Sequence, residues 1–142
     1  MRTLVFIWVG VLGASLTYGQ DLQKVLVKSF NLDAINQMKI DLQGKYEIIA
    51  WNNDYLKVHI ELETSGLNDT SLRNLMRSGR YTLLLEDENG QAILKMPGME
   101  RKLPEKYKES VVYKIYKPDG LEILDDQGSL LGNAADDPSQ PQ

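Results

Sequence analysis

The stretch INQMKIDLQGKYEIIAWNNDYLKVHIELE, which runs from residue 35 to residue 63, decides the fold. In its last part, apolar side chains alternate with polar ones: Leu56, Val58, Ile60 and Leu62 are separated by Lys57, His59 and Glu61. This period of two predicts a strand with one buried face and one solvated face. The segment 38–42 repeats the pattern, and polar or glycine-containing turns at 43–44 and 52–54 separate the strands.

A third strand is expected between these two, from Tyr46 to Trp51. The apolar run at its end, Ile48 to Trp51, is nearly continuous. Such a run is typical of a strand that is covered on both faces or bent between two layers. The whole stretch therefore predicts a protein built on a sheet.

The first residues are typical of a secretory signal peptide. Met1 and Arg2 give a positive start, and Leu4 to Leu12 form an apolar run that small residues follow. We expect cleavage after Gly19, so that residues 1–19 are removed and the chain is exported to the periplasm or the extracellular space. A retained membrane anchor is the alternative, although a span needs about 20 apolar residues and this run is shorter.

The composition indicates one domain held together by core packing. Cleavage leaves about 123 of the 142 residues, which is enough for one core and too few for two. We expect the β-rich domain at 20–126 and a disordered polar tail at 127–142. The net charge is −4, with acidic and basic residues interspersed, and there is no cysteine. These properties argue against binding to nucleic acids or anionic membranes, disulfides and thiol chemistry. Because cleavage removes the apolar run at 4–12, we expect no stable membrane insertion of the mature chain.

After residue 63 the periodicity changes. Leucines and a methionine at helical spacing predict a helix at 70–78, which Asn68 or Asp69 caps and which Leu75 and Met76 dock onto the sheet. Gly79 is placed to end this helix.

Strands return beyond the helix. Asn89-Gly90 lies between two apolar segments, 80–87 and 91–96, and therefore predicts an antiparallel hairpin. Two further strands are expected at 109–117 and 121–124, and an additional one at 24–30 precedes the opening stretch.

Two of these segments carry a resemblance to a known family. The first is MKIDLQGKYEIIAWNNDYLKVHIELE and the second is YKIYKPDGLEIL, in which a Pro-x-Gly turn joins two strands. Both resemble segments of secreted Gram-negative proteins in the adhesin-like, GIN-type family, also called the auto-transporter adhesin head domain family. The resemblance implies an all-β fold of short β-helix-like turns and supplies no catalytic residues. The helix and the Asn-Gly hairpin depart from that family's pattern, so we expect an all-β fold with either a short β-helix-like or a sandwich-like arrangement of its sheets.

No catalytic constellation is evident in the sequence. His59 is the sole histidine and lies on the polar face of its strand, where it is either solvated or a pH-sensitive contact for a partner. The acidic runs 86–88, 125–126 and 136–137 lack the ligand spacing of a calcium loop. We therefore predict a protein that is not an enzyme and that has neither a metal nor another cofactor.

The loop from Trp51 to Tyr55 is the candidate binding site. Its residues are Trp51, Asn52, Asn53, Asp54 and Tyr55. Two aromatic rings around amide and carboxylate groups suit a sugar, because a ring stacks on a pyranose while the polar groups take its hydroxyls. We expect instead that Trp51 plugs the core and that the polar residues only form the turn, with sugar binding as the alternative. Tyr113 and Tyr116 should lie on opposite faces of their strand.

Three function classes follow in order. The first is a secreted, non-enzymatic, adhesin-like module that binds or scaffolds at the cell envelope, with an envelope protein or a glycan as partner. The second is a periplasmic subunit in envelope sensing, which would bind its partner by strand addition at an exposed sheet edge. The third is a hydrolase that uses carboxylates alone.

Overall fold

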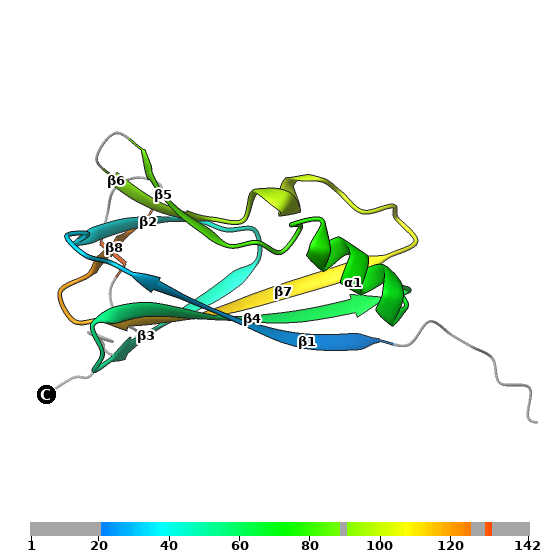
Figure 1. The fold of residues 1–142 in the computed structure, drawn as a ribbon, viewed down its shortest axis with the longest axis horizontal. Coiled ribbons are helices and arrows are strands. Elements are labelled where there is room, and N and C mark those ends of the chain that lie inside the picture. Colours follow the sequence, from blue (N-terminus) through cyan, green and yellow to red (C-terminus); the bar gives the residue numbers. More distant parts are fainter. Residues whose placement is uncertain (1–20, 89–90, 126–129, 132–142) are drawn as a thin grey trace, which may run out of the picture.

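The computed structural model describes residues 21–88, 91–125 and 130–131, which form two sheets and one short helix (Figure 1). The all-β prediction is confirmed. The predicted signal peptide, the Asn89-Gly90 turn and most of the predicted tail lie outside the described residues. No helix in the described ranges combines the length and the apolar character that a membrane span requires.

The first sheet, sheet A, contains the longest strands. Its order is β1-β4-β7-β3, with β1 at Leu22–Asn31, β4 at Tyr55–Ser65, β7 at Lys108–Pro118 and β3 at Lys45–Trp51. Strand β4 is antiparallel to both β1 and β7, whereas β3 is parallel to β7. The two edges of sheet A are therefore β1 and β3.

The second sheet, sheet B, lies above sheet A in Figure 1. Its order is β5-β6-β2-β8, with β5 at Leu84–Glu88, β6 at Gln91–Lys95, β2 at Gln37–Asp41 and β8 at Glu122–Leu124. Strand β2 is parallel to both β6 and β8, and β5 is antiparallel to β6. This antiparallel pair is the predicted hairpin. The arrangement is a sandwich, and the regular β-helix that the family resemblance implied does not form.

One hydrophobic core joins the two sheets. The alternation in β4 is confirmed, since Leu56, Val58, Ile60 and Leu62 are at most 2% exposed. Tyr113 and Ile115 of β7 join them from sheet A, and Met38 and Leu94 face them from sheet B. Burial raises the pKa of Tyr113 to about 12.

The prediction for β3 was wrong. This strand is neither covered on both faces nor bent between layers, because it forms an edge of sheet A and exposes Tyr46 and Ala50. Its apolar run has a different cause. Ile48 packs against the core, while Ile49 lies opposite Tyr116 on the other face of the sheet.

Helix α1, at Asp69–Arg77, covers the end of sheet A that sheet B does not reach (Figure 1). The Asn68 side chain caps it by accepting a hydrogen bond from the Ser71 amide at 2.7 Å. Leu75 and Met76 pack against the core as predicted, but the buried anchor is Leu72, which is 0% exposed. A short 3-10 helix at Pro97–Glu100 then leads toward β7.

Two further segments form contacts that the sequence did not predict. Glu86 and Glu88 of the acidic run 86–88 form ion pairs with Lys95, at 2.6 and 2.9 Å. Leu131, which falls in the predicted disordered tail, donates a 2.8 Å backbone hydrogen bond to Ile123. Leu130 also forms an isolated antiparallel bridge with Leu124. The predicted boundary between domain and tail stays a prediction.

Candidate functional site

The outer face of sheet A, which points away from sheet B, contains the predicted aromatic loop. The strand register places Lys57 of β4 beside Tyr116 of β7, and Trp51 of β3 beside Pro118. The Lys57 ammonium lies 4.5 Å from the centroid of the Trp51 ring and 4.7 Å from that of Tyr116. Both are cation–π contacts, so the lysine holds the two rings together.

Trp51 also has direct contacts with Tyr55. The ring centroids lie 4.8 Å apart in an edge-to-face arrangement, and the indole Nε1 donates a 3.0 Å hydrogen bond to the Tyr55 carbonyl. Tyr116 completes the cluster at 5.5 Å from Trp51. The expectation that Trp51 plugs the core was therefore wrong. Its ring is half-buried on the outer face and does not belong to the core cluster.

The polar residues of the same loop lie beside this cluster. Asn52, Asn53 and Asp54 line an open hollow of about 490 Å³ together with Asp119, which follows β7. The five candidate residues are thus neighbours, but Lys57 and Tyr55 already contact the Trp51 ring. Binding of a sugar at this loop stays a prediction. His59 lies on the same face, 5.0 Å from Tyr116 between ring centroids, and Tyr113 lies on the opposite face, as predicted.

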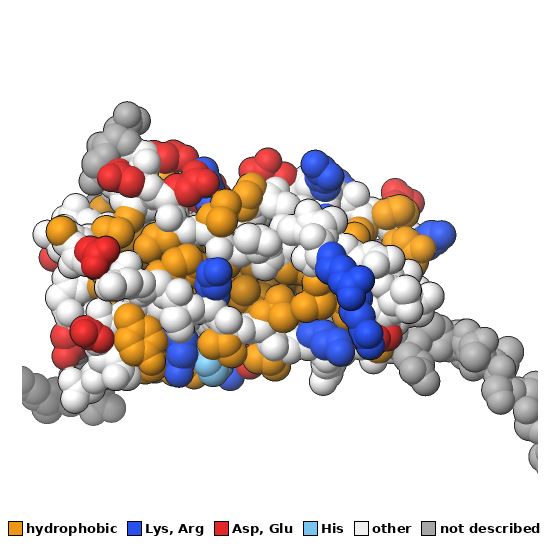
Figure 2. All heavy atoms as spheres, in the orientation of Figure 1, with side chains coloured by type: hydrophobic (Ala, Val, Ile, Leu, Met, Phe, Trp, Pro, Cys, Tyr) orange, Lys and Arg blue, Asp and Glu red, His pale blue; other side chains and the backbone are white. Residues whose placement is uncertain are grey.

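Strand β1 offers a second surface. It pairs with β4 over all ten of its residues, and no described residue pairs with its other side. Val25 and Val27 are 63% and 56% exposed on the outer face. Figure 2 shows further apolar side chains between the layers, on the side where β1 and β5 run. Leu26 and Phe30 of β1 and Leu85 of β5 are only partly buried there.

Two lysines of β1 point to the inner side of the sheet. Lys24 and Lys28 lie opposite the buried residues Leu62 and Val58. Lys24 forms an ion pair with Asp69 of α1 at 3.5 Å, and the Lys28 ammonium lies 5.9 Å from the Phe30 ring centroid. Sequence reasoning placed a strand at 24–30 but did not identify its free edge. The alternation of lysine with valine in KVLVKSF was the available signal.

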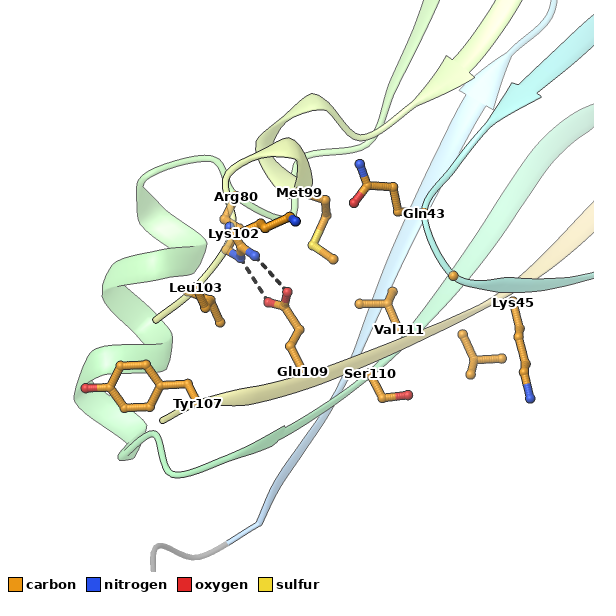
Figure 3. A pocket seen from close by; sticks show the side chains of 12 residues that line it. Gln43, Lys45, Arg80, Met99, Lys102, Leu103, Tyr107, Glu109, Ser110 and Val111 are labelled. Atoms are coloured by element: carbon orange, nitrogen blue, oxygen red, sulfur yellow. Dashed lines mark hydrogen bonds and ion pairs between the residues drawn. The ribbon is translucent and has the colours of Figure 1, made fainter. Parts of the chain in front are cut away.

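A cleft at the other edge of sheet A was also missed. It has a volume of about 660 Å³ and lies between the beginning of β3, the first part of β7 and the segment 98–107 (Figure 3). Met99, Leu103 and Tyr107 form one wall, and Gly44 and Val111 belong to the other. Lys45 and Lys102 also line the cleft and are exposed.

A buried ion pair holds the cleft together. Arg80 donates to both carboxylate oxygens of Glu109, from Nε at 2.9 Å and from Nη2 at 2.7 Å, and Figure 3 shows the two side chains pointing toward one another. Its Nη1 donates to the carbonyls of Gly98, at 3.2 Å, and Arg101. The Tyr81 hydroxyl also donates to Glu109. The wall at 98–101 is thereby fixed to β7.

The contacts between Arg80, Tyr81 and Glu109 shift the pKa values of all three side chains. Burial would raise the pKa of Glu109, but hydrogen bonds from Arg80 and Tyr81 outweigh burial and hold this pKa below its ordinary value. The hydrogen bond to Glu109 likewise raises the pKa of Arg80, and burial raises that of Tyr81. Glu109 is therefore a permanently ionised structural group near neutral pH, in contrast to a general acid, which needs a raised pKa.

Comparison with known proteins assigns the chain to no family. No family model matches the chain, and no curated protein matches it. Among solved structures it is similar to a protein from Clostridium sporogenes described as "a putative cell adhesion protein", with 13% sequence identity and a TM-score of 0.44. The alignment covers 73% of this chain and 46% of the other, so the chain spans about half the length of that protein.

Proposed function

We propose that the mature chain is a non-enzymatic, adhesin-like binding module of the bacterial cell envelope. In this proposal, a segment of a partner protein binds as an additional strand along β1. The single observation that carries the proposal is the free edge of β1. This strand has ten residues, pairs with β4 along one edge only within the described part of the chain, and exposes two valines. Unpaired strand edges bind peptides through main-chain hydrogen bonds, and alternate side chains supply specificity.

The side chains of β1 favour a selective partner over self-association. Inward-pointing lysines on an edge strand are a common protection against uncontrolled pairing. If two copies of β1 paired as antiparallel strands centred on Leu26, Lys24 of one copy would lie opposite Lys28 of the other. Like charges directly opposite each other are unfavourable. A partner strand with acidic residues at these positions and apolar residues beside Val25 and Val27 would avoid that repulsion.

The other function classes have less support. A hydrolase that relies on carboxylates needs one carboxyl group with a raised pKa, whereas the pKa values of Asp69 and Glu109 are both lowered. A glycan at the Trp51 loop would have to displace Lys57 or use the free parts of the rings. Adhesion and envelope sensing differ only in the identity of the partner, and both would use the β1 edge.

Affinity capture from an envelope extract tests the proposal. The bait is the mature protein, and the edge variant carries Val25→Lys together with Val27→Lys. The control variant carries Ala34→Lys together with Thr82→Lys, two exposed positions outside the strands, and adds the same charge. We expect a specific protein on the wild-type and control baits that is absent from the edge variant. Equal capture by all three baits would contradict the proposed role of β1.

Export is part of the same proposal and has its own test. Intact-mass measurement of the protein from its native host should give a chain that starts at Gln20, because the apolar run at 4–12 is typical of a cleaved signal. A membrane-bound species that retains residues 1–19 would contradict it.

A further inference from the structure

The register of sheet A leaves the beginning of β7 with a neighbouring strand on one side only. Strand β4 pairs with β7 from Lys108 onward, but β3 pairs with β7 only from Val112 onward. The residues 108–111 therefore have a strand on one side and, within the described part of the chain, none on the other. The cleft lined by Lys45 and Lys102 lies along this half-edge.

A close backbone approach fixes where β3 begins. Gly44 has a φ of 119°, and a Cβ at this position would lie 2.5 Å from the Val111 carbonyl oxygen. Only glycine fits such a conformation and such a contact. The Val111 carbonyl therefore faces the β3 side of β7. Because the backbone groups of a strand alternate between its two sides, those of Glu109 point toward the same open edge.

The opposite wall of the cleft is preformed and partly apolar. Met99, Leu103 and Tyr107 are half-buried there, so each keeps apolar surface that a ligand could cover. The bonds from Arg80 to the carbonyls of Gly98 and Arg101 hold this wall in place. A wall that is already ordered loses little entropy when a segment binds, which lowers the cost of binding.

The charge of the cleft is opposite to that of the chain. Arg80 and Glu109 neutralise each other, whereas Lys45 and Lys102 form no ion pair with any residue that the structure describes. Two uncompensated positive charges thus line the cleft of a protein with a net charge of −4. Complementary charge favours an anionic occupant and sets its register.

We infer that this cleft is a second docking site, which takes a short, extended, acidic segment of a partner protein. The segment continues the line of β3 beside Glu109. Its acidic side chains lie on the face of Lys45, and its apolar side chains cover Met99 and Leu103 on the other face, while the positive charge of Lys102 adds to the attraction. An extended chain advances about 3.3 Å per residue, so the half-edge accommodates about four residues.

Fluorescence anisotropy with a defined probe tests this inference. The protein is the mature full chain, and the probe is a capped, fluorescein-labelled peptide in which valine and glutamate alternate over six residues. A second probe has lysine in place of glutamate. We expect saturable binding of the glutamate probe and binding of the lysine probe that is weaker by about tenfold or more. Equal binding of the two probes, or no saturable binding of the glutamate probe, would overturn the inference.

Charge-reversal variants locate the site. Lys45→Glu with Lys102→Glu should weaken binding of the glutamate probe by about tenfold or more. The matched control, Lys39→Glu with Arg77→Glu, changes the net charge equally at two basic residues outside both the cleft and β1 and should leave the affinity unchanged. Equal weakening in both variants would show only general charge attraction and would overturn the inference. If the double variant misfolds, Lys102→Ala at the exposed cleft residue tests the same contact.

The chain's own tail is the competing occupant. Residues 132–142 contain Asp136 and Asp137 and no basic residue. If this tail occupies the cleft, its removal should strengthen binding of the glutamate probe, and that result would contradict a partner segment as the occupant. Unchanged affinity after its removal supports the partner. The glutamate probe also has the alternation proposed for a partner of β1, so the variant Val25→Lys with Val27→Lys is measured beside the cleft variant. Probe binding that only the β1 variant removes would place the probe on β1 and would overturn the inference for the cleft, whereas binding that only the cleft variant removes supports it.

Discussion

The two faces of sheet A use similar side chains for different purposes. On the inner face, Tyr113 is fully buried and packs with the aliphatic residues of β4. On the outer face, Trp51 and Tyr116 are only half-buried and are held by Lys57. The inner face stabilises the fold because its apolar side chains are buried. The outer face contributes less burial, and at its edge, on β1, Val25 and Val27 are exposed. Sheet A therefore covers its apolar groups on the inner face and leaves some of them in contact with solvent at β1, where we propose that a partner binds.

The largest expected effect concerns two neighbouring residues on opposite faces of β7. Glu109→Gln should lower the free energy of unfolding by about 3 to 5 kcal/mol, because it leaves the buried Arg80 without its ionic partner. The control Ser110→Ala, at an exposed position, should change this free energy by less than about 0.5 kcal/mol. Urea denaturation measures both. Similar values for the two variants would contradict the burial of the ion pair.

The same ion pair predicts a pH dependence. The pKa of Glu109 is lower in the folded protein than its ordinary value of 4.5, so folding favours the ionised form. Its contribution to stability is therefore complete above that ordinary value and is lost as the pH falls through the lowered pKa. Thermal melts at decreasing pH should show a steeper loss of stability for the wild type than for Glu109→Gln.

The second effect tests the cover that α1 gives to the inner face. Leu72→Ala should cost about 2 to 5 kcal/mol through lost burial and a cavity. Arg73→Ala should cost under about 0.5 kcal/mol, because the Arg73 side chain is 63% exposed and its ion pair with Asp69 lies at the surface. The partly buried Leu75 should fall between them. Midpoints of urea denaturation give the order, and a harmless Leu72→Ala would show that the helix does not contribute to the core.

The third effect is smaller and concerns the outer face. Trp51→Ala should cost about 1 to 2 kcal/mol, since it removes aromatic and cation–π contacts without opening a cavity in the core. Lys57→Met keeps much of the side-chain volume and should cost less. Chemical denaturation of both variants checks the order. A cost of about 3 kcal/mol or more for Trp51→Ala would restore its assignment to the core.

The smallest effect concerns the exposed end of the outer face. Val25→Thr with Val27→Thr should change the free energy of unfolding by less than about 0.5 kcal/mol, because both side chains contact solvent already. Loss of partner binding without loss of stability would separate the role of β1 in function from its role in the fold. A clear loss of stability would mean that the two valines are covered.

The sequence predicts those elements whose signal is local. The alternation of apolar and polar residues in β4 predicted which of its side chains are buried, and the capping residue Asn68 predicted where the helix begins. The run in β3 was misread because local periodicity does not tell whether the second face is covered by another layer or by neighbours such as Tyr116. The cleft depends on the register between Lys45 and Val112, which no local pattern contains. The free edge of β1 likewise depends on strand order, although the exposed valines were visible as an alternation with lysine.

The central claim is that β1 is an edge that takes a partner strand. Site-specific photo-crosslinking in the native host tests it directly, with benzoylphenylalanine at position 27 on β1 and at position 41 on β2, an internal strand of sheet B. The β1 proposal predicts an adduct of one defined mass from position 27 and no such adduct from position 41. No adduct from position 27, or the same adduct from both positions, would contradict it.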